Sequence, residues 1–154
     1  MHIALQDDTF LMRSIYDNNT YSLDTSYFVI DKELKKIKYC SARLNVLLIK
    51  ENGLKIFPKN NISLGFPFYN VGQLMEHTIS YEPGDILVVF NEELVNQSGG
   101  KHGKKLGMKM VGNMLNNNCK QPWKTRDKYL SKMLQQWTGE ATEIEQILIA
   151  QIKL

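Results

Sequence analysis

The chain has only two cysteines among its 154 residues, Cys40 and Cys119, and they lie in no CxxC or Cys/His spacing. A cysteine-based motif is therefore not indicated. One disulfide between them is compatible with the sequence, but two free thiols in a reducing compartment are favoured.

Long hydrophobic runs are also missing. No apolar stretch reaches the roughly 18 residues that a membrane-spanning helix needs. Residues 1–10 have neither a basic segment nor an apolar core, so the sequence predicts no secretory signal. We expect a cytoplasmic protein that does not insert into a membrane.

The chain has little excess charge of either sign. It carries 19 lysines and arginines against 16 aspartates and glutamates, a formal net charge of +3. A nucleic-acid-binding domain usually has stronger and more clustered positive charge, so nucleic acid is not the expected partner. The hydrophobic fraction of 43% and the length fit one globular core, and we expect residues 1–154 to form a single domain.

Hydrophobic periodicity and turn residues predict a mixed fold. The expected strands are 21–30, 37–40, 45–50, 54–57, 77–81, 85–90 and 147–154. The expected helices are 2–18, 106–115 and 126–137, with Gly139 as a C-terminal stop. Asn52-Gly53 and Pro83-Gly84 are typical of tight turns, and 99–105 is expected to be a flexible basic loop. This order predicts the α+β class, with antiparallel β-sheets and flanking helices.

Three motifs follow one another in an informative order. They are Pro83-Gly84-Asp85, then Gln97-Ser98-Gly99-Gly100 with Gly103-Lys104-Lys105, then Trp137-Thr138-Gly139. In this order and spacing the chain resembles the sporulation stage II E-like branch of the PPM-type serine/threonine phosphatases. The resemblance covers nearly the whole chain and implies a partial phosphatase-like β-sandwich. It matches the C-terminal part of such a domain, without the family's N-terminal strands and their metal-binding aspartates.

The resemblance also implies where the chemistry would lie. Such phosphatases hold two Mn²⁺ or Mg²⁺ ions with aspartates, and the ions activate the attacking water. Here the Ser/Thr-Asp-Gly position reads Asn91-Glu92-Glu93, and the terminal Asp-Asp pair reads Glu145-Gln146. A glutamate moves its carboxylate by one C–C bond, more than a precise metal site tolerates. Glu92 and Glu145 remain candidates for a single metal site, but two solvated carboxylates are the favoured interpretation.

Two basic segments are further candidates. The residues Gly99, Gly100, Lys101, Gly103, Lys104 and Lys105 could cradle a phosphate or contact a partner, although a surface loop is favoured. Lys120, Lys124, Arg126 and Lys128 lie beside Trp123, where a solvated helix start is favoured over a nucleic-acid contact. Trp137 is expected to pack at the end of its helix against the sheet.

The retained scaffold motifs and the altered ligand positions together predict a non-catalytic, phosphatase-like module that binds a protein partner or regulates an attached domain. The alternative is an active Mn²⁺- or Mg²⁺-dependent phosphatase, completed by an upstream segment or a partner. A sandwich without its first strands exposes sheet edges, which predicts a homodimer.

Overall fold

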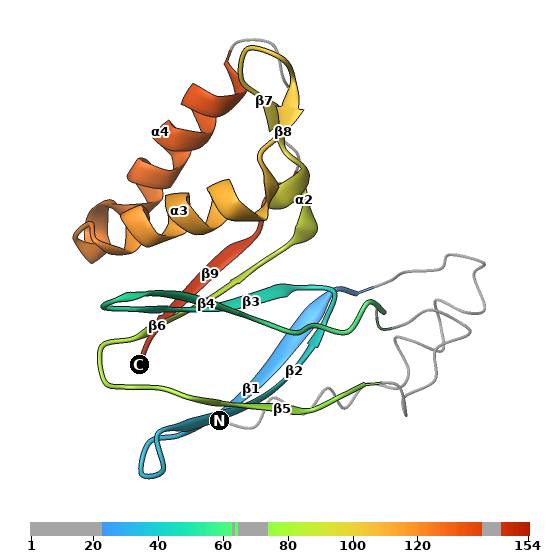
Figure 1. Cartoon of the computed structure of the whole chain (residues 1–154). Helices are drawn as coiled ribbons and strands as arrows, with labels where there is room; N and C mark the ends of the chain where they lie inside the picture. Colours follow the sequence, from blue (N-terminus) through green and yellow to red (C-terminus); the bar gives the residue numbers. More distant parts are fainter. Residues whose placement is uncertain (1–22, 63, 65–73, 140–145) are drawn as a thin grey trace.

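The computed structural model describes residues 23–62, 64, 74–139 and 146–154. Two antiparallel sheets form its centre (Figure 1). The three-stranded sheet has the order β1 (Thr25–Asp31), β2 (Lys36–Ala42), β5 (His77–Ser80). The four-stranded sheet has the order β4 (Gly53–Phe57), β3 (Asn45–Lys50), β6 (Ile86–Phe90), β9 (Ile149–Lys153).

The helices follow β6 in the chain. They are α2 (Glu92–Asn96), α3 (Gly107–Cys119), the 3₁₀ turn η2 (Trp123–Thr125) and α4 (Arg126–Thr138). Between α2 and α3 lies a small antiparallel ladder of β7 (Ser98–Gly99) and β8 (Lys104–Lys105).

The molecule has three layers, which Figure 1 shows from the helices above to the three-stranded sheet below. One apolar core lies between the sheets, where Tyr39 and Ile79 meet Leu48 and Leu87. A second core lies between the four-stranded sheet and the helices, where Val88 and Phe90 meet residues of α3 and α4. All five residues of β6 are buried because this strand is covered on both faces. A near-continuous apolar run is what such a strand requires.

The predicted α+β class is confirmed, and the predicted strands within the described ranges are present. The turn at Asn52-Gly53 has Gly53 at a φ of 142°, a conformation that L side chains rarely adopt. Gly139 ends α4 with a φ of 66°, as predicted. Helix α3 is longer than predicted, since it continues to Cys119. The predicted helix at 2–18 lies outside the described residues.

Cys40 and Cys119 are free thiols, as favoured from the sequence. Within the described ranges, no helix is both long enough and apolar enough to cross a membrane.

Candidate functional site

The candidate site lies where β6 ends and α2 begins. Asn91 makes three hydrogen bonds to the segment that leads into β9. Its Nδ2 donates to the Gln146 carbonyl at 2.7 Å, and its Oδ1 accepts from the Leu148 amide at 3.0 Å. Its backbone amide donates to the Leu148 carbonyl at 3.3 Å. The two altered segments, 91–93 and that around Gln146, therefore adjoin. Glu145 lies outside the described residues, so its pairing with Glu92 stays a prediction.

Glu92 has its own partners. Its Oε2 accepts hydrogen bonds from the Lys59 ammonium at 2.5 Å and from the Asn45 amide at 3.1 Å. Lys59 follows β4, whereas Asn45 begins β3 and pairs with Phe90 at the end of β6. The hydrogen bond from Lys59 has the largest effect and holds the pKa of the Glu92 carboxyl below its usual value. Burial opposes this, and the hydrogen bond from Asn45 lowers the pKa further. The carboxylate is therefore charged at neutral pH.

A shallow polar cleft of about 430 Å³ opens beside this ion pair, and Arg43, Lys59, Asn61 and Glu92 line it. Two backbone hydrogen bonds of 2.8 Å fix its rim, from the Arg43 amide to the Asn60 carbonyl and from the Asn60 amide to the Ser41 carbonyl. Arg43 has a φ of 61°, which is rare for a residue with a side chain. Its ion pair with Asp24 is loose, with 3.7 Å between Nε and Oδ2.

These residues do not fit a hard divalent cation. A Mn²⁺ or Mg²⁺ ion needs several oxygen ligands, and Glu92 gives its Oε2 to an ammonium and an amide donor. Two of the four lining side chains are themselves cations, which repel a metal ion. The described ranges contain no group of three or more histidine, cysteine, aspartate or glutamate side chains arranged to hold a metal.

The glycine-rich segment 99–105 forms a hairpin that is hydrogen-bonded to α4, and not the flexible loop that was expected. The Gly100 amide donates to the Trp137 carbonyl at 2.8 Å, and the Gly103 amide donates to the Gly100 carbonyl at 3.3 Å. Both of these amides therefore have acceptors within the protein. All three lysines of the hairpin are exposed, and Lys105 also donates to Asn96 at 2.9 Å.

Trp137 explains the two adjacent glycines. A Cβ on Gly99 would lie 2.3 Å from the Trp137 carbonyl oxygen and 2.6 Å from its Cδ1, and a Cβ on Gly100 would lie 3.3 Å from the ring. The indole Nε1 donates to the Gln97 carbonyl at 3.0 Å. Trp137 lies at the end of α4 and packs against the apolar core between the helices and the four-stranded sheet, in line with the expectation. Its contacts with the hairpin were not expected from the sequence.

Sequence reasoning missed Lys59, Asn45, Arg43 and Asn61. Lys59 and Glu92 are 33 residues apart, and neither belongs to a recognisable motif with the other. The pairing of β3 with both β4 and β6 brings Asn45 and the segment after β4 to the same edge of the sheet as Glu92. Arg43 reaches this edge through the backbone hydrogen bonds that join Ser41 and Arg43 to Asn60. The single available signal was the polar Asn45 at the start of an otherwise apolar strand.

Solved structures share this architecture. The SiaA-PP2C domain of Pseudomonas aeruginosa superposes with a TM-score of 0.72 at 13% identity, over 94% of this chain and 64% of that one. The structure of the RsbU and RsbW domains of a Mycobacterium tuberculosis protein gives 0.65 at 12% identity, over 93% and 39%. The phosphatase domain of SpoIIE from Bacillus subtilis, presoaked with Mn, gives 0.56 at 13%, over 98% and 68%.

The chain has the fold of the SpoIIE-like PPM phosphatase domains. The resemblance stated from its motifs is therefore confirmed at the level of the fold. The chain spans 64% of the SiaA-PP2C domain and 39% of the RsbU–RsbW chain. No protein-family model matches the sequence, and no curated protein matches it.

Proposed function

We propose that this PPM-type domain is non-catalytic and acts as a protein-binding or regulatory module. The observation that carries the proposal is the ion pair between Lys59 and Glu92. The position at which the resemblance puts a metal-binding aspartate holds a glutamate, and the charge of that glutamate is balanced by an ammonium group. Displacing the ammonium would leave a lysine in a cleft beside Arg43, so binding a metal ion there is opposed by two like charges.

The most direct test combines metal binding with hydrolysis. Mn²⁺ and Mg²⁺ are titrated into the purified chain by calorimetry, and p-nitrophenyl phosphate hydrolysis is followed with and without each ion. We expect Glu92→Ala to change neither the heat nor the rate, because Glu92 does not hold a metal. Metal-dependent hydrolysis well above background that Glu92→Ala abolishes would overturn the proposal and establish the alternative, an active phosphatase.

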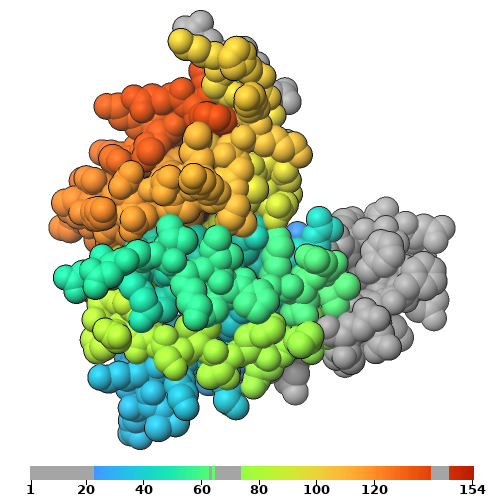
Figure 2. Space-filling view, viewed as in Figure 1, coloured from blue at the N-terminus to red at the C-terminus, as the bar shows by residue number. Residues whose placement is uncertain are grey.

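A protein partner is the second part of the proposal. The β7–β8 hairpin projects beyond the helices and away from both sheets (Figures 1 and 2). Its exposed Lys101 and Lys104 are held on a rigid support, because Trp137 fixes the hairpin from below. A rigid, basic projection suits an acidic protein surface, since little side-chain and backbone freedom is lost on binding. One similar structure contains an RsbU domain together with an RsbW domain, which supports an interacting protein for this fold.

Lysine-reactive cross-linking in cells followed by mass spectrometry tests this surface. We expect intermolecular cross-links to concentrate at Lys101 and Lys104. Lys32 and Lys36, exposed lysines at the turn between β1 and β2, are the matched control sites. Cross-links spread evenly over all exposed lysines would contradict a partner surface at the hairpin.

A cytoplasmic location remains part of the proposal, supported by the free thiols of Cys40 and Cys119. A single domain over 1–154 is also part of it.

A further inference from the structure

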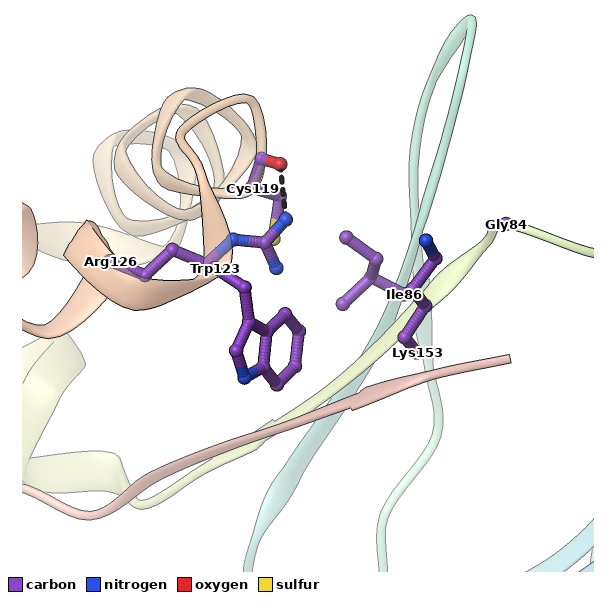
Figure 3. A pocket seen from close by; sticks show the side chains of 6 residues that line it. All are labelled: Gly84, Ile86, Cys119, Trp123, Arg126 and Lys153. Carbon is purple, nitrogen blue, oxygen red and sulfur yellow. Dashed lines mark hydrogen bonds between the residues drawn. The ribbon is translucent and has the colours of Figure 1, made fainter.

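A second cleft, of about 480 Å³, lies at the end of β6 opposite Glu92 (Figure 3). It is formed where the end of α3 and the start of α4 meet the four-stranded sheet. The lining residues are Gly84, Ile86, Cys119, Trp123, Arg126 and Lys153. Its volume is within the range of pockets that hold small molecules, and most of its lining is apolar, as in such pockets.

Trp123 is the main feature of this cleft. The side chain is 53% exposed, although an indole of this size normally gains by burial. In Figure 3 it extends from the 3₁₀ turn η2, just before α4, toward the strands that carry Ile86 and Lys153. An exposed indole in a cleft offers a flat face on which a planar ring can stack.

Arg126 fixes this indole in place. Its guanidinium carbon is 4.6 Å from the ring centroid of Trp123, a cation–π contact. Three hydrogen bonds hold the guanidinium: Nη2 to the Cys119 carbonyl at 2.6 Å, Nε to the Gln121 carbonyl at 3.1 Å, and Nη1 to the Gln151 Oε1 at 3.1 Å. A guanidinium has five N–H groups, so two remain for a ligand. The stacking face is thus preorganised.

The charge of the cleft is positive. Arg126 and Lys153 line it, and none of its lining residues is acidic. Burial raises the pKa of the Cys119 thiol, so this group stays neutral at physiological pH. The neighbouring Asp85 carboxylate is 3.3 Å from the Lys50 ammonium and is therefore paired. An anion entering the cleft meets two cations without a competing carboxylate among the lining residues.

We propose that this cleft binds a small ligand with a planar ring and an anionic group, of the chemical class of a nucleoside monophosphate. The ring stacks on Trp123 above the apolar Ile86, and the anion contacts Lys153 and the remaining N–H groups of Arg126. Because the cleft is compact and offers one indole, it favours the binding of a small ligand with one planar ring system over the binding of an extended acidic peptide. The proposal is independent of the Glu92 site and of the function proposed above.

The indole N–H signals in a two-dimensional NMR spectrum of the ¹⁵N-labelled chain provide the test. The chain has two tryptophans, and Trp137 serves as an internal control because its Nε1 is bonded to Gln97. Adenosine monophosphate, adenosine and inorganic phosphate are titrated separately. We expect the monophosphate to shift the Trp123 signal with saturation, with roughly tenfold lower affinity for adenosine and for phosphate alone, since each lacks one contact.

Two variants separate the ring contact from the charge contact. We expect Trp123→Ala to weaken monophosphate binding roughly tenfold or more. Lys153→Gln should weaken the monophosphate but leave adenosine unchanged, whereas Lys128→Gln, an exposed lysine of α4 outside the lining, should change neither. Equal effects of the two lysine variants, an unshifted Trp123 signal, or tighter binding of an octaglutamate peptide than of the monophosphate would each overturn the proposal.

Discussion

Replacing Gly99 with alanine tests whether Trp137 shapes the glycine-rich hairpin. The added Cβ would lie 2.3 Å from the Trp137 carbonyl oxygen and 2.6 Å from Cδ1, distances that real Cβ atoms essentially never show. One of the close atoms belongs to the backbone of α4, so a side-chain rotation alone cannot relieve the contact. The hairpin must move away from the helix.

The expected cost has two parts. Overpacking of this kind costs about 1–3 kcal/mol. Moving the hairpin also breaks the 2.8 Å hydrogen bond from the Gly100 amide to the Trp137 carbonyl, for about a further 1 kcal/mol. We expect Gly99→Ala to lower the free energy of unfolding by about 2–4 kcal/mol in urea denaturation. For a chain of this length the melting temperature should fall by on the order of 10 °C.

Gly103→Ala is the matched control. Gly103 has a φ of 59°, but a Cβ there would meet nothing within 4 Å. This variant therefore carries only the strain of a left-handed residue, about 1 kcal/mol. If Gly99→Ala destabilises the chain no more than Gly103→Ala does, the close contact with Trp137 does not constrain the hairpin and the reasoning is wrong.

Three further predictions concern other parts of the molecule. Because the folded pKa of Glu92 is lowered from 4.5, its charged form contributes stability that is present above about pH 4.5 and is lost as the pH falls through the folded pKa. Glu92→Gln should therefore lower the free energy of unfolding by about 0.5–1 kcal/mol at neutral pH, a figure reduced because the side chain is partly exposed, and should not change it in acid. Chemical denaturation at several pH values measures this difference, and a difference that stays constant with pH would contradict the prediction. Asn118→Ala should lower the free energy of unfolding by about 2 kcal/mol. The fully buried amide of Asn118 donates to a backbone carbonyl of α4 at 2.7 Å and accepts from Gln151 at 2.6 Å. Asn117 is exposed, so Asn117→Ala should keep a melting temperature close to the native one. Among the described residues, β9 and β1 each have no strand paired on their outer side, which predicts a homodimer. A monomer in light scattering at high protein concentration would contradict this prediction.

The sequence alone determined the class of the fold and much of its element order. The apolar run at 86–90 predicted the central strand, because a strand that is covered on both faces carries apolar side chains at successive positions. Gly53 and Gly139 marked a turn and a helix end, because their positive φ angles exclude most other residues. These signals are local, so they can be read along the chain without knowing what packs where.

Tertiary structure decided the site. Lys59 meets Glu92 across 33 residues only because β3 pairs with both β4 and β6, and no local pattern encodes that pairing. From the sequence, Gly99 and Gly100 were expected to lie in a flexible surface loop, with a phosphate cradle as the less favoured alternative. In the structure a Cβ on either glycine would lie closest to Trp137, which α4 brings to them. Contacts between distant segments depend on how the layers stack, and for this reason the partners of Glu92 became visible only in the folded chain.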